Sequence, residues 1–437
     1  MIADTETKPS SVLTTDPDFG DAGLPQWYQD LQSSAWEASS ALPLPKRTDE
    51  PWRFGDLKRA AALEAFQSAA SLDEATVKGL IARSSQLEET SGKFVFANES
   101  LAHADRPAVD GLICVPLAEA VEKHAQLLQE HFMTQDAKLG SEKFAQLHKS
   151  RTKSGLFIYV PAGVEIALPI EAFHWVGGAN ASMFPHTLIV TGENSKVTVV
   201  DYYGSASDSE AGLACGVVDL VAGRGSKLRY VACQSLSPTS SNIHISSTLA
   251  SADADVKSLQ VQIGSAWSRT ESVSHLSGKG ANSDMLSLSA PSSSQQVDQR
   301  TLQHHGEAHT TSDLLYKNAL NDKSRSVFAG LIMVDEGAHY TDAYQTCRNL
   351  LLSDEAEANS MPGLEINADQ VKCSHGSTSG PITEEDVFYF NARGIPTDIA
   401  KQLITYGFAA EVFGKLRHEA IEAMVGRLVE EKFSQLS

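Results

Sequence analysis

The chain has 437 residues, enough for two or three domains and at least one sizeable core. With 35 Lys and Arg against 55 Asp and Glu, its formal charge of -20 repels phosphate backbones and argues against nucleic-acid binding. The N-terminal segment has neither the basic start nor the apolar core of a secretion signal, and its acidic residues argue against a transit peptide. No apolar run is long enough for a transmembrane helix, so we expect a cytoplasmic protein without a membrane partner.

The five cysteines are widely scattered: Cys114, Cys215, Cys233, Cys347 and Cys373. They form no CxxC pair and no even framework, which indicates reduced thiols rather than disulfides. An iron-sulfur cluster held by one chain normally needs about four thiolates, grouped in sequence or brought together by the fold. Any such cluster would therefore need ligands from another chain.

The N-terminal third divides into two segments. Residues 1–45 are rich in Ser, Thr, Asp and Pro and predict a loosely ordered leader. Residues 46–154 predict a helical domain, because apolar residues recur three and four apart from Leu57, and a second such stretch begins at Pro116.

Residues 155–382 consist mainly of short β-branched runs broken by Gly, Ser, Asn and Asp, which predicts strands. Four similar runs begin at Ser195, Ser226, Asp255 and Ser283, at steps of 31, 29 and 28 residues. A near-constant step of this size is typical of a β-solenoid whose coils stack on one another. A β-sandwich of similar hairpins is the alternative.

Residues 383–437 return to a helical period and predict a C-terminal helical domain that caps the strands. The simplest role of its apolar stripe is core contact with the end of the solenoid. A docking face for another protein is the alternative. The stripe includes Phe408, Val412, Phe413 and Leu416.

Nucleotide chemistry by this chain is not expected. The sequence has no G-x-x-x-x-G-K-[ST] loop, no G-x-G-x-x-G between a strand and a helix, and no G-x-S-x-G elbow. If ATP is involved, a partner must bring it.

The densest histidine group is QHHGEAHTTSD, which holds His304, His305 and His309. On an extended strand His305, Glu307 and His309 would share one face, as in a two-histidine, one-carboxylate metal site. The alternative is that these histidines only form hydrogen bonds or meet solvent.

The stretch QVKCSHGSTSG places Cys373 and His375 two residues apart. If the stretch is extended, both side chains share a face, and Gly376 would let the chain turn away behind them. Two metal ligands on one face make an incomplete site, so a buried thiol beside a hydrogen-bonded imidazole stays open.

The sequence resembles the SufB/SufD family of iron-sulfur cluster assembly proteins. The segments that carry this resemblance are EPWRFGDLKRA, GLFIYVPAGVEIALPI, KSRSVFAGLI, RNLLLS, VKCSHG and FYFNARGI. The chain is more similar to SufD than to SufB members, because Cys373, Ser374 and His375 match the Cys-Ser-His of SufD and Phe390 stands where SufB carries a cysteine. Cys347 departs from the expected asparagine, and its role stays open.

The resemblance implies a right-handed parallel β-helix between N-terminal and C-terminal helical domains. It implies pairing with SufB through the β-helix, with a homodimer as an option for the isolated chain, and docking of the SufC ATPase on the C-terminal helices. It also implies a non-catalytic scaffold that holds a nascent iron-sulfur cluster with SufB, with His375 as a ligand and Cys373 as a second candidate. Reduced flavin is associated with such complexes, although the chain has no flavin motif.

Two alternatives remain at this point. A SufB-like homodimeric scaffold would hold the cluster alone, and Phe390 argues against it. A β-helix enzyme that acts on polysaccharide would need clustered carboxylates or basic residues, whereas the predicted strands offer mainly Ser, Thr and Gln.

Overall fold

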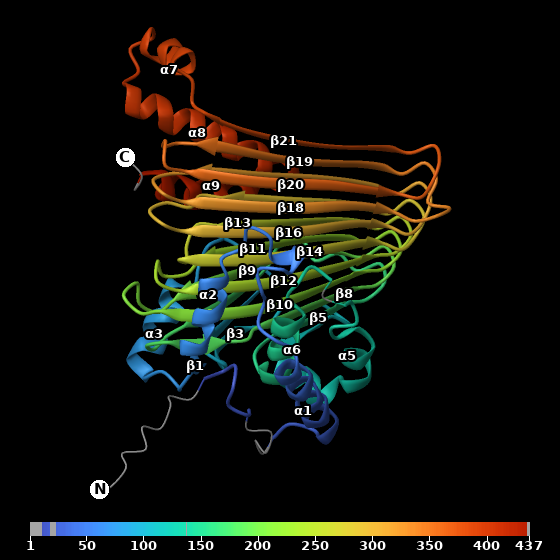
Figure 1. Ribbon diagram of the computed structural model, residues 1–437. Helices are drawn as coiled ribbons and strands as arrows, with labels where there is room; N and C mark the ends of the chain where they lie inside the picture. Colours follow the sequence, from blue (N-terminus) through green and yellow to red (C-terminus); the bar gives the residue numbers. More distant parts are fainter. Residues whose placement is uncertain (1–10, 18–22, 137, 435–437) are drawn as a thin grey trace, which may run out of the picture.

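The computed structural model describes residues 11–17, 23–136 and 138–434. Its centre is a solenoid of parallel strands that alternate along the chain between two sheets, with helices before and after it in sequence (Figure 1). Each coil contributes one strand to each sheet and stacks on the coil before it. The predicted mainly β fold, a parallel β-helix flanked by helices, is confirmed.

The strands of the two sheets are as follows. The first sheet contains β4 (Ile113–Pro116), β5 (Gly155–Val160), β8 (His186–Thr191), β10 (Gly212–Ala222), β12 (Ser241–Ala250), β14 (Trp267–Leu276), β16 (Gln296–His305), β18 (Arg325–Val334) and β20 (Glu357–Ile366), with β1 (Gln67–Ser68) and β7 (Ala181–Met183) at its side. The second contains β3 (Ser100–Asp105), β2 (Gly92–Ala97), β6 (Ile170–Val176), β9 (Lys196–Ser205), β11 (Lys227–Ser235), β13 (Asp255–Gln262), β15 (Asn282–Ser289), β17 (Thr311–Leu320), β19 (Asp342–Leu351) and β21 (Lys372–Pro381).

Parallel, in-register pairing explains the spacing seen in the sequence. Gln296 of β16 pairs with Arg325 of β18, and Thr311 of β17 pairs with Asp342 of β19, so equivalent positions lie one coil apart. A sandwich of hairpins is therefore wrong, because neighbouring core strands would then be antiparallel. Antiparallel pairs occur at the N-terminal end of the solenoid, between β2 and β3 and between β4 and β5.

The space between the two sheets changes in chemistry along the solenoid. In the early coils it is filled by aliphatic side chains such as Leu156 and Val197. In later coils the inward positions carry buried amides and hydroxyls: Gln299 donates to Ser287 at 3.0 Å. A polar interior is tolerated because most of its groups are hydrogen-bonded to one another.

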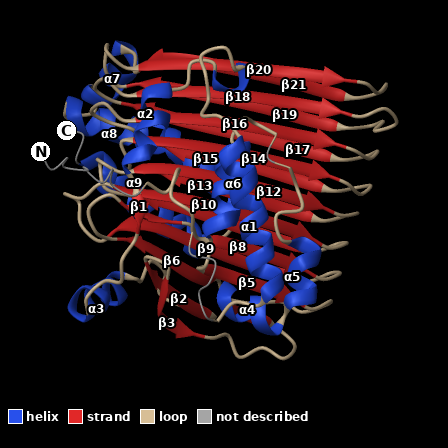
Figure 2. Cartoon of the chain, turned by 60° about the horizontal axis from the view of Figure 1, so that its bottom comes forward, coloured by secondary structure: helices blue, strands red, loops and turns tan. Residues whose placement is uncertain are grey.

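Six helices precede the main run of strands in the described residues: α1 (Gln26–Ala41), α2 (Leu57–Ala62), α3 (Glu74–Arg83), α4 (Leu117–Lys123), α5 (Ala125–His131) and α6 (Glu142–Arg151), with short 3-10 turns η1 (Glu50–Trp52) and η2 (Leu63–Ala65). Figure 2 shows α1 and α6 lying over the outer face of the first sheet. Phe144 and Leu147 of α6 pack there against Leu213 and Val217 of β10.

The prediction of a loosely ordered leader over residues 1–45 differs from the structure in the described part of this segment. Helix α1 forms within residues 1–45, and the Tyr28 hydroxyl donates to the carbonyl of Thr152 at 3.1 Å. Residues 1–10 and 18–22 of that leader lie outside the described part. At the other predicted boundary, β21 ends at Pro381 and α7 begins at Glu384.

The C-terminal helices are α7 (Glu384–Asn391), α8 (Thr397–Phe413) and α9 (Glu419–Ser434), with a 3-10 turn η3 (Gly414–Leu416). Val412, Phe413 and Leu416 are buried in one cluster with Val261 and Leu288 of the second sheet. The predicted core contact is thus correct, but its location is not: α8 and α9 pack on the outer face of a sheet and do not cap the end of the solenoid. None of the helices in the described ranges is long and apolar enough to cross a membrane.

Candidate functional site at the open end of the solenoid

The last coil of the solenoid lacks a neighbour on one side. β20 and β21 are the terminal strands of their sheets and pair only with β18 and β19 within the described residues (Figure 1). Most residues of β21 are exposed. The coil thus presents an unpaired backbone edge and an uncovered inner face.

Two inward-facing apolar residues of β20, Leu364 and Ile366, are exposed at this open end. Leu364 and Ile366 are in register with Ile332 and Val334 of β18, which are fully buried one coil below. Leu364 is nevertheless 37% exposed and Ile366 39% exposed. The positions that form core elsewhere in the solenoid are therefore open to solvent here.

Cys373 and His375 lie on this uncovered face. They are in register with Ala343 and Gln345, which are buried inward residues of β19. The prediction that the two side chains share a face is confirmed, because in-register neighbours and alternate residues of a strand point the same way. The expected turn at Gly376 is wrong, since β21 continues to Pro381.

The two side chains differ in exposure. Cys373 is half-buried against the cluster around Ile332 and Ala343, and this burial raises the pKa of its thiol, with Asp342 adding to the rise. His375 is exposed. The imidazole is thus the more accessible of the two candidate ligands.

Cys347 lies one coil deeper on the same inner face. It is in register with Ser377, and its Sγ is 3.8 Å from the Ser360 Oγ. Burial raises the pKa of the Cys347 thiol to about 11, so it is protonated at neutral pH. All five cysteines are free thiols.

The predicted metal arrangement of His305, Glu307 and His309 is wrong. β16 ends at His305, so the two other residues fall in the following turn. His305 points inward and is buried, whereas the His309 ring stacks on Tyr340 with centroids 4.8 Å apart. His304 bonds to Asp335 at 2.8 Å.

Within the described residues no group of three or more His, Cys, Asp and Glu is placed to hold a metal ion. His375 and Cys373 could contribute at most two ligands. A cluster bound at the open end would therefore take its remaining ligands from another molecule.

The C-terminal helices add a second exposed surface. Phe388 and Tyr389 of α7 are 69% and 56% exposed, and Ile399 and Leu403 of α8 are each 46% exposed. No residue of α7 is buried. We call these four side chains the α7–α8 apolar surface. The sequence pattern did not distinguish them from the buried apolar residues of α8 and α9.

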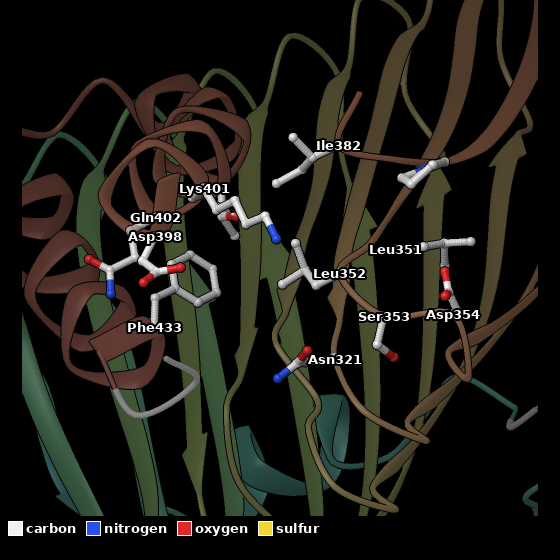
Figure 3. Close-up of a pocket in the computed structure, with 12 residues that line it drawn as sticks. Asn321, Leu351, Leu352, Ser353, Asp354, Ile382, Asp398, Lys401, Gln402 and Phe433 are labelled. Carbon is white, nitrogen blue, oxygen red and sulfur yellow. Dashed lines mark hydrogen bonds between the residues drawn. The ribbon is translucent and has the colours of Figure 1, made fainter. Parts of the chain in front are cut away.

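A cleft of about 400 Å³ separates α8 from the turns of the solenoid (Figure 3). Its walls include Leu352, Ile382 and Phe433, and the Lys401 ammonium points into it. The C-terminal helices are thus only partly packed against the last coils.

The sequence of the chain is similar to those of known proteins. The sequence profile described as "SUF system FeS cluster assembly, SufBD core domain" matches residues 174–408, and "SufBD protein N-terminal region" matches residues 22–172. The "Iron-sulfur cluster assembly protein SufD" of Bacillus subtilis is 26% identical over 419 residues, which cover 93% of this chain and 94% of that protein. The SufD of Escherichia coli is 33% identical over 290 residues, covering 65% of this chain and 68% of that protein.

The "Iron-sulfur cluster assembly protein SufB" of Bacillus subtilis is 24% identical over 394 residues, covering 89% of this chain and 82% of that protein. The two family profiles together span most of the chain. The chain therefore belongs to the SufBD family of iron-sulfur cluster assembly proteins.

Proposed function

We propose that this chain is a SufD-type scaffold subunit, which pairs with SufB through the open end of its solenoid and shares a nascent iron-sulfur cluster with it. The similarity to two proteins named SufD supports the type of subunit. The observation that carries the pairing is the exposure of Leu364 and Ile366, whose register partners one coil below are buried. A second molecule stacked on the last coil would bury them.

The unpaired edges support the same proposal. Long, exposed edge strands are aggregation-prone unless they are blunted or covered, and β20 and β21 are each ten residues long. A SufB subunit that pairs along them would satisfy their backbone groups. A second copy of this chain could do the same in isolation, which is the homodimeric alternative.

In this proposal His375 is the ligand that the chain gives to the cluster, and Cys373 is an adjacent thiol that can join it. Neutral imidazole is a competent iron ligand, as in Rieske centres. The thiolates come from SufB. The cluster is the cargo of the complex, and the flavin association implied by the resemblance is assigned only to the assembled complex.

The α7–α8 apolar surface is proposed to dock the SufC ATPase. Four large apolar side chains that are 46% to 69% exposed on two neighbouring helices form a surface suited to a protein partner. ATP hydrolysis then belongs to SufC, the chain itself is not a catalyst, and the complex is cytoplasmic. The polysaccharide-acting alternative is set aside, because the named relatives are assembly proteins.

Co-expression of the chain with SufB and SufC tests this function. We expect a complex of the three proteins that, after anaerobic incubation with iron and sulfide, holds a cluster with a visible absorbance. The isolated chain treated in the same way should hold little. A stable cluster of full stoichiometry on the isolated chain would contradict the shared site.

A further inference from the structure

The amide of Gln345 lies directly beneath His375 in the inward ladder. The two residues are in-register partners of β19 and β21, and the partner of Gln345 on the other side is the aliphatic Leu314. The Gln345 Oε1 atom is buried and has no hydrogen-bond partner within the described residues. Of the two register partners of Gln345, His375 and Leu314, only His375 has a polar side chain that could bond to this oxygen.

The orientation of this amide follows from the hydrogen bonds around Gln303. The Gln303 Nε2 donates to the Ser312 Oγ at 2.7 Å and to the carbonyl of Tyr344 at 3.1 Å, which uses both of its hydrogens. The Gln303 Oε1 is therefore an acceptor, and it receives the Gln345 Nε2 at 3.5 Å. Gln345 consequently keeps its nitrogen toward Gln303 and its oxygen away from it.

The same chain of bonds continues to His305. Since the Ser312 Oγ accepts from Gln303, its own proton is free to go to the His305 Nε2, 2.8 Å away. The His305 Nδ1 then donates to the Thr310 Oγ1 at 2.7 Å, and that hydroxyl donates to the carbonyl of Glu307 at 3.0 Å. Burial, reinforced by His304, lowers the pKa of His305 to about 4, so the ring is neutral and can act as donor and acceptor at once.

Gly330 on the facing sheet leaves room for the amide. A Cβ at this position would lie 2.4 Å from the Gln345 Nε2 and 2.7 Å from the Thr301 Oγ1. The glycine of the KSRSVFAGLI segment is thus explained by a close approach to Gln345.

We propose that Gln345 is a positioning residue for His375: its Oε1 accepts the ring N–H of His375 and so leaves the other ring nitrogen free for iron, while the chain through Gln303 and Ser312 to His305 holds the amide in this orientation. Histidines that bind metals commonly donate a hydrogen bond from the N–H of their other ring nitrogen to a carbonyl or carboxylate oxygen, which fixes the tautomer. Side chains one strand apart in register are close enough for this bond after rotation of the exposed imidazole. This inference rests on the proposed role of His375. It gives His305, from the QHHGEAHTTSD segment, a part in orienting Gln345 rather than in binding metal.

The test measures the tautomer of His375 without iron or partners. The full chain, labelled with ¹⁵N in its 14 histidines, is examined by NMR in alkaline buffer, and the His375 signals are assigned by their loss in His375→Ala. We expect one dominant tautomer in the wild type and in Gln345→Glu, which keeps an acceptor oxygen. Gln345→Leu should give the tautomer mixture of a free imidazole.

Thr301→Val is the matched control, because the Thr301 Oγ1 is another buried oxygen without a hydrogen-bond partner in the described residues and lies beside the same glycine, Gly330. It should leave the His375 tautomer unchanged. Should Gln345→Leu fail to fold, Gly330→Ala displaces the same amide and should also release the tautomer. A free mixture in the wild type, a single tautomer retained in Gln345→Leu, or an equal change in Thr301→Val would each overturn the proposal.

A second readout separates this inference from the function on which it rests. In the complex with SufB and SufC, Gln345→Leu should weaken iron binding by about 10- to 100-fold, the usual effect of losing a group that orients a ligand. If His375→Ala retains the cluster, the proposed function fails whatever the tautomer result. If His375→Ala loses the cluster but Gln345→Leu binds iron as the wild type does, only the positioning role fails.

Discussion

The Arg269 guanidinium lies 3.8 Å from the ring centroid of Trp52, at the contact between the N-terminal segment and the outer face of the solenoid. Arg269 is completely buried and pairs with Glu271 at 2.7 Å and Asp298 at 2.8 Å. It also donates to the carbonyls of Pro51 and Leu139. One cation thus holds two distant stretches of the N-terminal region against the sheet.

Arg269→Leu is expected to lower the free energy of unfolding by about 3–5 kcal/mol, because it leaves the buried Glu271 carboxylate without its cation and leaves Asp298 paired with Arg300 alone. Urea denaturation measures the change. As a control, Lys323→Ala breaks the exposed pair with Glu355 and should cost at most about 1 kcal/mol. Equal, small effects of the two substitutions would show that the buried cation does not hold the interface.

Acid should destabilise the protein through its buried histidines. Burial, reinforced by His186, lowers the pKa of His148 from 6.5 to about 3. Below pH 6.5 the unfolded chain therefore takes up a proton that the folded chain refuses, so stability is complete above that pH and falls as the pH drops toward 3. The loss approaches about 1.4 kcal/mol per pH unit for each such group.

Between pH 6.5 and pH 4, the loss of unfolding free energy should be about 2–3 kcal/mol smaller in His148→Gln than in the wild type. The shift of the urea midpoint with pH measures this loss. His309→Asn changes an exposed histidine and keeps a residue that tolerates its positive φ of 60°. It should leave the pH dependence as in the wild type. An unchanged slope in His148→Gln would count against the buried neutral imidazole.

The α7–α8 apolar surface predicts the effect of a single charge on SufC docking. Leu403→Asp places a carboxylate on a helix face that also carries Ile399, and it should weaken SufC binding at least about tenfold, or 1.4 kcal/mol. Calorimetry measures the affinity and circular dichroism checks the fold. Leu101→Asp, at a 44% exposed leucine of β3, should bind SufC as the wild type does, and equal loss in both variants would refute this location.

The two cysteines near the open end should respond differently to serine. Cys347 is fully buried, so Cys347→Ser should cost about 1–3 kcal/mol through an imperfectly bonded hydroxyl. Cys373 is half-buried, and Cys373→Ser should cost less than about 1 kcal/mol. Thermal denaturation of both variants decides the order, and a larger loss for Cys373→Ser would contradict the placement of these thiols.

The repeat spacing predicted the solenoid because in-register parallel pairing requires coils of nearly equal length. The predicted C-terminal cap was wrong, since an amphipathic stripe shows that a helix has an apolar neighbour but does not show which surface that neighbour is. Met424 and Val425 are buried against the second sheet, so removing residues 397–437 would expose core. Point substitutions on exposed residues are therefore needed to test docking.

The site was only partly predictable for a related reason. Alternation placed Cys373 and His375 on one face, but the inner face of the last coils carries Gln and Ser, so polarity did not distinguish inside from outside. The buried position of His305 was missed because its strand ends at this residue, and the sequence did not show whether Glu307 and His309 continue the strand or lie in the following turn.

The proposed function depends most on His375 as a ligand of the cluster shared with SufB. The most direct measurement is the iron and sulfide content per assembled complex of the three proteins, with His375→Ala compared with Ser374→Ala, which changes the exposed neighbour on the opposite face of β21. Both variants should form the complex, because neither removes the apolar contact of Leu364 and Ile366. We expect Ser374→Ala to keep the cluster content of the wild type and His375→Ala to lose most of it. Wild-type cluster content in His375→Ala would show that His375 is not a ligand of the cluster.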